Sequence, residues 1–331
     1  MSERVLLHMT APVRDAFDIP YHDLGPAGGV PRVALVAGLH GNELSGVFVL
    51  SRLAGFLADV AAGARPPLAL CARVIVVPAV NVLGVNVGRR AWPFDGTDLN
   101  RMFPGYDAGE TTQRIARAVF ETTRAAHYRI DVHSSNPEFE ELPQVRLYDP
   151  SEAERRTARL FGLPAVVERP TSTMVSATLG HAWRALGGES FVLQAGRAGD
   201  LQLEHADRLF GAIVRFCTRI GILTGTRLAD EDDEVRHFGP RQTLPLVSEH
   251  AGLFVSRVKI GAWLRAGDHI GFVYDGFDAA LRAEVKAPRA GLLSGLRRQP
   301  LLCEGDLVAR IETREDLPPG GADTFLYGHG Q

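Results

Sequence analysis

The chain has 331 residues, of which 45% are hydrophobic and 23% charged, and its formal net charge is −3. This length allows two domains and a sizeable buried core. The composition is typical of a soluble globular protein, and without a basic excess we expect no nucleic-acid surface. We also expect no membrane span, because no run approaches the roughly 20 apolar residues that one needs.

Targeting and redox signals indicate a cytoplasmic protein. The N-terminal segment has no basic region followed by a continuous apolar stretch, so a signal peptide is not expected. The chain has three cysteines, which are far apart and therefore fit a reducing compartment: Cys71, Cys217 and Cys303. A homo-oligomer is compatible with the sequence, which does not specify one.

Through the first two-thirds of the chain, short β-branched runs alternate with amphipathic segments. The runs predict strands at 32–39, 73–80, 128–134, 144–149 and 190–196. The amphipathic segments predict helices at 42–59, 110–127, 151–161, 173–187 and 201–220. This alternation indicates an α/β fold with a mixed, mainly parallel sheet and helices on both faces. Functional residues are then expected at the carboxyl ends of the strands.

The pattern changes after Leu223. A polar, acid-rich stretch without apolar periodicity is followed by short strands separated by glycine turns, which is typical of a small all-β sandwich. We therefore expect three parts: a catalytic domain at 1–226, a linker at 227–240 and a C-terminal β-sandwich domain at 241–331.

The C-terminal part resembles the biotinyl/lipoyl-type sandwich. Two similar Gly-Asp turns, at Gly267 and Gly305, indicate two similar halves, and an Ala-Pro-x-x-Gly turn begins at Ala287. A carrier domain of that type presents a lysine at the tip of a hairpin. Lys286 instead lies beside the proline turn, so carriage of biotin or lipoate is not expected.

The stretch G-L-H-G-N-E places two metal-ligand types, His40 and Glu43, three residues apart after a predicted buried strand. Three residues make nearly one helical turn, so both side chains can reach one ion. Gly38 and Gly41 permit tight backbone geometry around the histidine. Zinc binds such nitrogen and oxygen ligands, although a lone His-x-x-Glu pair is a weak signal.

A third candidate ligand, His133, ends another predicted strand and is followed by a Ser-Ser-Asn-Pro loop. Asp131 lies on the same side of that strand under the two-residue alternation, where it could accept an imidazole N–H. Between these motifs, a Gly/Pro/Asp-rich stretch carries Arg90, Asn100 and Arg101. Arginine binds carboxylates through two parallel hydrogen bonds, and asparagine adds an orienting amide.

In this order, the motifs resemble the succinylglutamate desuccinylase/aspartoacylase family, which belongs to the wider zinc-carboxypeptidase fold. They are H-x-x-E, then Arg90 with D-L-N-R-x-F-P-G from Asp98 to Gly105, then D-x-H ending at His133. The resemblance extends over the whole chain, since the similar subgroup has a C-terminal β-domain. It implies that a zinc-bound water removes the acyl group from an N-acyl amino acid or related amide.

The resemblance also implies the role of each residue. One zinc ion per chain would be held by His40, Glu43 and His133, with Asp131 hydrogen-bonded behind the ligands. Arg90 would stabilise the developing oxyanion. Asn100 and Arg101 would bind a substrate carboxylate.

The general base is the one departure from the family pattern. The family has a glutamate there, in a pattern like V-E-x-G, but the matching stretch S-F-V-L-Q-A-G has Gln194. Glutamine cannot accept a proton at neutral pH. Three interpretations stay open: an inactivated variant, a natural member with another proton carrier, or a protein that binds without catalysing. Other nearby carboxylates are Glu189, Glu138, Glu140 and Glu141.

The leading hypothesis is a zinc-dependent deacylase that acts on a small N-acyl amino acid or N-acyl amine. Because Gln194 stands at the expected base position, we expect hydrolysis to be impaired or to use another proton carrier. The alternatives are carboxypeptidase-like cleavage of a short peptide and a non-catalytic, zinc-dependent binding protein. The substrate is expected to be small and anionic or zwitterionic, because four arginines lie near the expected site: Arg89, Arg90, Arg101 and Arg197.

Overall fold

The computed structural model describes residues 3–10, 16–171, 176–226 and 234–318. Four parallel strands form the middle of a large sheet in the order β5-β3-β6-β9. They are almost wholly buried, as expected of β-branched runs that are covered on both faces. Their bounds are β3 (Val33–Ala37), β5 (Val74–Val77), β6 (Tyr128–Ser135) and β9 (Glu189–Arg197).

Antiparallel strands extend this sheet at both edges. At one edge, β2 of an N-terminal β1-β2 hairpin pairs with β5. At the other edge, β7 pairs antiparallel with β9, and β8 pairs parallel with β7. The added strands are β1 (Glu3–Thr10), β2 (Ala16–Leu24), β7 (Phe139–Tyr148) and β8 (Ala165–Arg169). The predicted α/β class with a mixed, mainly parallel sheet is confirmed.

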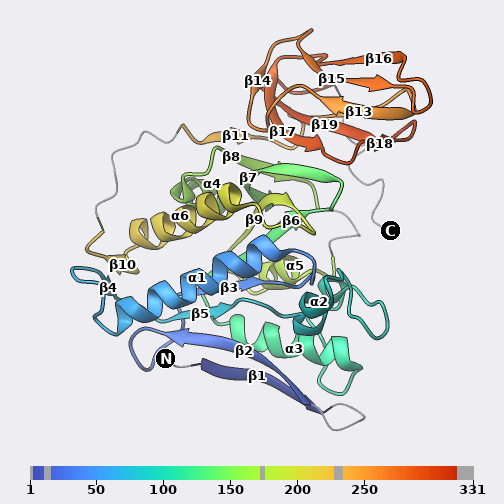
Figure 1. The fold of residues 1–331 in the computed structure, drawn as a ribbon. Helices are drawn as coiled ribbons and strands as arrows, with labels where there is room; N and C mark the ends of the chain where they lie inside the picture. The colour runs from blue at the N-terminus through green and yellow to red at the C-terminus, as the bar shows by residue number, and fades with distance from the viewer. Residues whose placement is uncertain (1–2, 11–15, 172–175, 227–233, 319–331) are drawn as a thin grey trace.

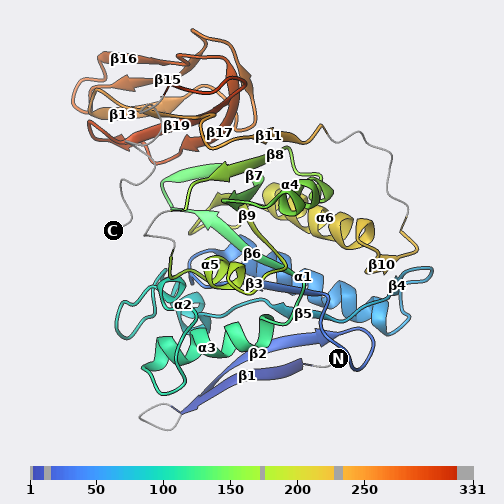
Figure 2. The same cartoon turned by 180° about the vertical axis from the view of Figure 1, so that it is seen from behind.

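Helices cover both faces of the sheet (Figures 1 and 2). The longest two, α1 (Leu44–Ala61) and α6 (Leu203–Arg219), pack together on one face. The other face carries α3 (Thr111–Thr123) and α5 (Leu179–Arg184). The shorter helical segments are α2 (Val82–Val87), α4 (Glu152–Ala158), η1 (Leu99–Arg101) and η2 (Arg159–Phe161).

Among the described residues, α1 is the one helix long and apolar enough to cross a membrane by length and composition. Its side chains Leu50, Leu53 and Leu57 are at most 1% exposed. They belong to the apolar core that α1 forms with α6, β3 and β6. These contacts explain its apolar composition by packing inside the fold.

The structure agrees with those predicted helices and strands that rest on long apolar sequence patterns. All five predicted strands are present, and α1 and α6 closely match their predicted ranges. The helix expected at 173–187 is shorter and forms α5, with residues 172–175 outside the described part. The sequence patterns did not predict β1, β2, β8 or α2. The hairpin strands are partly exposed at the sheet edge, and α2 has only 6 residues, so their apolar patterns are weak.

The C-terminal region forms a two-layered sandwich around its own apolar core, as expected (Figure 1). One layer is the sheet β16-β15-β13-β18. The other, β17-β19-β12 with β14 at β17, continues the central sheet because β17 pairs with β7. The strands are β12 (Thr243–Val247), β13 (Gly252–Ser256), β14 (Trp263–Leu264), β15 (His269–Tyr274), β16 (Leu281–Lys286), β17 (Gly291–Arg297), β18 (Leu301–Leu302) and β19 (Leu307–Thr313).

The domain boundaries remain a prediction, but part of the expected linker has structure. Residues 227–233 lie outside the described part, whereas Arg236–Phe238 form β11, which pairs in parallel with β8. This portion extends the central sheet. Nearby, β4 (Ala69–Leu70) and β10 (Leu223–Thr224) form a separate two-stranded ladder.

The two Gly-Asp turns of the sandwich have the same conformation. Gly267 and Gly305 have φ angles of 90° and 86°, which favour glycine. In each turn the aspartate accepts a backbone N–H three residues earlier, at 2.7 Å in both cases. The similarity expected from the sequence therefore extends to hydrogen bonding.

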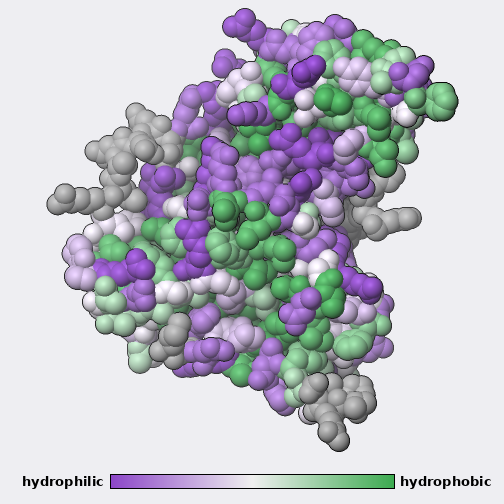
Figure 3. Space-filling model, in the orientation of Figure 1, coloured by the Kyte–Doolittle hydropathy of each residue, from purple (hydrophilic) through white to green (hydrophobic). Residues whose placement is uncertain are grey.

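Glu140 of β7 connects the central sheet to both α6 and the C-terminal region. Its carboxylate lies 2.6 Å from His205 Nε2 and accepts a hydrogen bond from Arg298. Burial alone would raise the pKa of Glu140, but the hydrogen bonds from His205 and Arg298 lower it to about 2. Hydrophilic residues gather on the surface over this junction in Figure 3, while a small apolar cluster that includes Leu142 and Leu292 packs inside it.

Replacing Glu140 with glutamine should destabilise the fold at neutral pH and matter less in acid. Its pKa falls from the ordinary 4.5 to about 2 on folding, so the ionised group stabilises the fold above about pH 4.5. That stabilisation is lost as the pH falls toward 2. We expect the urea-unfolding free energy of Glu140→Gln to lie roughly 2 kcal/mol below wild type at pH 7. The difference should shrink to less than half of that at pH 3.

The control is Glu304→Gln, at an exposed turn position, which should match wild type at both pH values. A deficit of Glu140→Gln that is equally large at pH 7 and pH 3 would contradict this assignment.

Candidate active site

The loop after β3 brings His40 and Glu43 to the carboxyl edge of the sheet. Gly38 has a φ of 63°, and a Cβ there would lie 2.9 Å from Ala79 Cα. A Cβ on Gly41 would lie 2.1 Å from the carbonyl carbon of Gly84, so this position requires glycine. Glu43 then directly precedes α1, where the helix dipole favours a negative charge.

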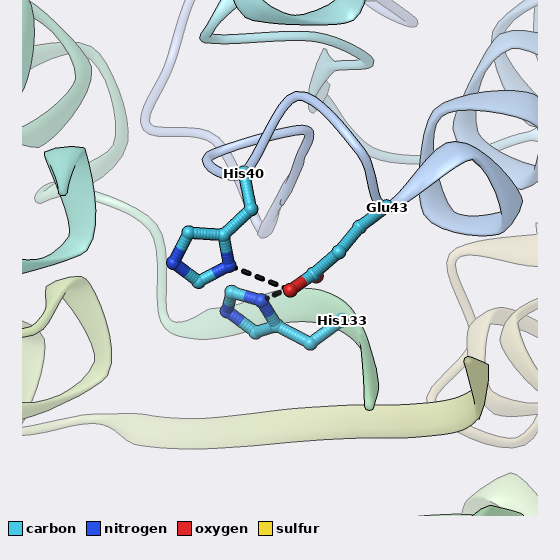
Figure 4. Close-up of side chains that lie close together, drawn as sticks. All are labelled: His40, Glu43 and His133. Carbon is cyan, nitrogen blue, oxygen red and sulfur yellow. Dashed lines mark hydrogen bonds and ion pairs between the residues drawn. The ribbon is translucent and has the colours of Figure 1, made fainter. Parts of the chain in front are cut away.

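His40, Glu43 and His133 point toward one another in Figure 4. His40 Nδ1 lies 2.6 Å from Glu43 Oε1, and His133 Nδ1 lies 2.9 Å from Glu43 Oε2. The backbone N–H of Ser134 also donates to Glu43 Oε2, at 3.0 Å. One potential ligand atom from each of the three side chains lies within 4.8 Å of the other two. The structure therefore brings together the three residues that the sequence predicted as metal ligands.

Each imidazole contacts a second carboxylate through its other nitrogen. His133 Nε2 lies 2.9 Å from Asp131 Oδ2, and His40 Nε2 lies 3.0 Å from Asp98 Oδ1. A proton on each Nε2, donated to these carboxylates, leaves the Nδ1 lone pairs facing Glu43. Lone pairs at these distances repel unless a proton or a cation lies between them. The three residues thus fit a divalent cation, and two imidazoles with one carboxylate are a donor set that zinc prefers.

The electrostatics of Glu43 agree with this arrangement. Burial alone would raise the pKa of the Glu43 carboxyl, but the charges and hydrogen bonds of His40 and His133 hold it well below its ordinary value. Burial would lower the pKa of His133, yet Asp131 and Glu43 raise it well above the ordinary value. Carboxylates therefore surround both imidazoles, and the site favours a positive charge at its centre.

The three polar residues of the 88–105 stretch lie beside these ligands. Arg90 donates to Asp98 Oδ2 at 3.0 Å and lies 3.6 Å from Glu43 Oε1. Asn100 Nδ2 lies 3.5 Å from His133 Nε2, while its Oδ1 accepts the backbone N–H of Leu179 and holds the start of α5. Arg101 donates to the Asn100 carbonyl oxygen at 3.0 Å. The sequence motif named Asp98 but did not reveal its contact with His40, which depends on how the loop folds back.

A cavity of about 280 Å³ opens at these side chains. Its floor is the polar side of β6, β9 and β7, opposite the side that packs against α1 and α6. α5 contributes further lining residues. All eight site residues predicted from the sequence line it: His40, Glu43, Arg90, Asn100, Arg101, Asp131, His133 and Gln194.

Gln194 lies next to His133, since the two residues pair across β6 and β9. Its side chain is buried and lines the cavity, where a general base would have to act. Glu189 lies at the opposite end of β9, near His127, and does not line the cavity. Five strand residues span about 17 Å, so Glu189 is too far to replace Gln194.

Among the acids after His133, the cavity is lined by Glu141 and not by Glu138 or Glu140. Oε1 of Glu141 accepts hydrogen bonds from Arg146 and Arg310. Its Oε2 is buried without a hydrogen-bond partner among the described residues. Burial would raise the pKa of Glu141, but the two arginines lower it, which favours the ionised form.

The arginines differ from those expected. Arg90 and Arg101 line the cavity, whereas Arg89 and Arg197 do not. Three further arginines, which were not expected from the sequence, also line it: Arg146 of β7, Arg184 of α5 and Arg310 of β19. Strand alternation places Arg146 on the polar side of β7, but no local signal indicated that β19 reaches the site.

Several known proteins are similar to this chain in sequence and fold. The N-alpha-acetyl-L-2,4-diaminobutyric acid deacetylase of Halomonas elongata is 27% identical to this chain over 292 residues, covering 86% of this chain and 82% of the relative. A Pseudomonas aeruginosa succinylglutamate desuccinylase is 30% identical over 194 residues. The chain spans about half of that relative, 54% of its length.

Solved structures show the same fold. The product-bound ectoine utilization protein EutE (DoeB) of Ruegeria pomeroyi matches with a TM-score of 0.75 and 24% identity, covering 94% of each chain. A Rhodobacter sphaeroides succinylglutamate desuccinylase/aspartoacylase matches with a TM-score of 0.76 and 22% identity, covering 95% of this chain and 96% of the other. Residues 29–219, more than half of the chain, match the succinylglutamate desuccinylase/aspartoacylase catalytic domain. The chain therefore belongs to the succinylglutamate desuccinylase/aspartoacylase family, as its motifs predicted.

Proposed function

We propose that this protein is a zinc-dependent deacylase that hydrolyses the amide bond of a small N-acyl amino acid or related N-acyl amine. The observation that carries the proposal is the convergence of His40, Glu43 and His133 at a cavity that Asn100 and Arg101 also line. Family membership and the likeness to a deacetylase over most of both chains support it.

One zinc ion per chain would be held by His40, Glu43 and His133. When bound, it would supply an activated water and polarise the amide carbonyl. Asp98 and Asp131 would orient the two imidazoles by accepting their Nε2 protons, as carboxylates commonly do behind metal-bound histidines.

The remaining residues would bind and orient the substrate. Arg90 lies within reach of Glu43 and keeps part of its guanidinium exposed, so it can stabilise negative charge that develops on the carbonyl oxygen. Asn100 Nδ2 and the guanidinium of Arg101 can bind a substrate carboxylate, which would fix the amide near the ligand set.

Proton transfer is the weak step in this proposal. Gln194 occupies the position beside His133 but cannot take a proton from water or return one to the leaving amine. Glu141 lines the same cavity with one free oxygen, yet its two arginine partners make it a poor base. Hydrolysis by the native chain is therefore expected to be slow.

Gln194 also favours the main alternative, a protein that binds zinc and an N-acyl compound without turning it over. Such a protein would keep the ligands and the cavity but lack the proton carrier. Carboxypeptidase-like cleavage of a short peptide has less support, because the relative that matches over most of both chains is a deacetylase.

Replacing His40 with alanine should abolish metal binding, because two side chains cannot hold zinc as three do. Protein purified without chelators should contain about one zinc per chain by elemental analysis, and His40→Ala close to none. The control is His205→Ala, another buried histidine with a carboxylate partner, located outside the cavity. It should keep its zinc. Wild-type protein that binds no zinc would overturn the metal assignment.

Replacing Gln194 with glutamate should restore the proton carrier. For an N-acyl amino acid that the protein hydrolyses, we expect kcat/KM to rise by about 10²–10⁴ over wild type, which is the usual contribution of general acid–base catalysis. The assay compares N-acetyl and N-succinyl amino acids with N-acetylated diamino acids. Glu189→Gln, on the same strand outside the cavity, is the control and should leave kcat/KM unchanged.

Turnover by wild type that Gln194→Glu does not improve would exclude Gln194 from the base position. Binding of these compounds without turnover by either protein would support the non-catalytic alternative.

A further inference from the structure

Helix α5 forms one wall of the cavity, and its position depends on what it contacts. It packs against β6 and β9 on the face of the sheet opposite α1 and α6 (Figure 2). Its residues Gly180, His181 and Arg184 line the cavity. The helix has only 6 residues, and a helix this short is not stable by itself. Contacts at its two ends must therefore hold it in place.

At the cavity end, α5 is joined to the ligand set through Asn100. Asn100 Oδ1 accepts the N–H of Leu179 at 2.9 Å, and its Nδ2 lies 3.5 Å from His133 Nε2. A side-chain amide has one oxygen that accepts and one NH2 group that donates. Because Leu179 occupies the oxygen, Asn100 presents its NH2 group to the cavity. The orientation of this amide therefore depends on where α5 begins.

At the far end, the last turn of α5 is held by Arg129 of β6. Its Nη1 donates to the carbonyl oxygens of Trp183 and Gly187, at 2.8 Å each. The last carbonyls of a helix lack partners within the helix, and these hydrogen bonds help to satisfy them. The turn that follows fits the guanidinium closely, since a Cβ on Gly188 would lie 3.2 Å from Arg129 Nη2.

Arg129 is an unusual residue for such a buried position. Its side chain is 4% exposed, and burial lowers the pKa of its guanidinium. Within the described part of the chain it has no carboxylate partner, and its Nε has no hydrogen-bond partner. A cation buried against neutral carbonyls costs free energy that an apolar side chain of similar size would not. Its hydrogen bonds to α5 therefore explain this arginine better than packing does.

These contacts join β6 and α5 at two separate points. Arg129 and His133 are four residues apart, so they lie on the same side of β6, about 13 Å from each other. α5 runs in the opposite direction, because its first residue bonds to Asn100 beside His133 and its last turn bonds to Arg129. A shift at one end of this short helix is consequently transmitted to the other.

We propose that Arg129 is a positioning residue for the active site. By holding the last turn of α5, it keeps the Leu179 N–H on Asn100 Oδ1, so that the NH2 group of Asn100 faces the substrate. Without this support the amide can rotate and present its oxygen, which repels a carboxylate. The inference rests on the proposed function, in which Asn100 helps to bind a substrate carboxylate. Arg129 itself does not line the cavity.

The test compares Arg129→Met with Arg215→Met in the zinc-loaded, full-length protein. Arg215 of α6 is the matched control, because its Nη1 likewise donates to two carbonyl oxygens, those of Phe161 and Gly162, outside the cavity. Calorimetry measures the affinity for N-acetylglycine, the smallest N-acyl amino acid. Arg129→Met should weaken binding about tenfold, as expected for the loss of one hydrogen bond to a charged group. Arg215→Met should stay within about twofold of wild type, and both variants should keep one zinc per chain.

A double-variant cycle separates positioning from a general loss of stability. Asn100→Ala should weaken the binding of N-acetylglycine by a similar factor. Arg129→Met should then add less than about twofold to that loss, because both changes act on one contact. Arg129→Lys keeps a donor at this position and should recover part of the affinity. Losses that simply add, or an equal loss of affinity in Arg215→Met, would contradict a positioning role.

Amide hydrogen exchange reports on α5 without any ligand. The Leu179 N–H should exchange about tenfold faster in Arg129→Met and in Asn100→Ala than in wild type, and at the wild-type rate in Arg215→Met. Unchanged exchange of Leu179 in Arg129→Met would overturn the proposal. If exchange follows Arg129 but wild type binds no N-acyl compound, the positioning role stands while the deacylase proposal fails.

Discussion

The contact of one buried carboxylate with two imidazoles is the interaction on which this site depends. An ionised carboxylate as buried as Glu43 costs several kcal/mol unless charges and hydrogen bonds compensate for it. The compensation comes from His40 in the loop after β3, and from His133 and the N–H of Ser134 in β6. These segments meet because β3 and β6 are adjacent and parallel, so their carboxyl ends coincide at one edge. The order of the central strands is thus a condition for the site.

The alternation of side chains along β6 and β9 divides the sheet into an apolar and a polar side. Ile130, Val132 and Leu193 join the core beneath α1 and α6, while Asp131 and Gln194 face the cavity. Buried polar atoms are normally paired, yet on the polar side Asp131 Oδ1 and Ser190 Oγ have no partner among the described residues. Such a surface is unfavourable inside a core and suitable beside a ligand. The fold therefore accepts a local cost in stability at the proposed active site.

The ordered motifs and the family resemblance that they carry predicted which three residues come together, but not the whole cavity. His40, Glu43 and His133 each follow or end a buried strand, and the ends of parallel strands lie at one edge of the sheet. The adjacency of β3 and β6 then brings them together. Arg310 is different, because it reaches the cavity through pairing between β7 and β17, which are about 150 residues apart. The contact of Asp98 with His40 similarly depends on the path of an irregular loop. The N-terminal hairpin escaped prediction because it lies at an exposed edge, where burial imposes little pattern.

The residue at position 194 connects the proton-transfer problem with the charge of the cavity. A glutamate there would place a fourth carboxylate among the lining residues, close to Glu43 and Asp131, and would partly balance the five arginines. The glutamine keeps the shape of that side chain and removes its charge. The cavity is consequently less able to move protons and more able to retain an anionic ligand. Under the proposed function, Gln194 would therefore slow the proton transfers of hydrolysis and would leave the arginines of the cavity less balanced by negative charge.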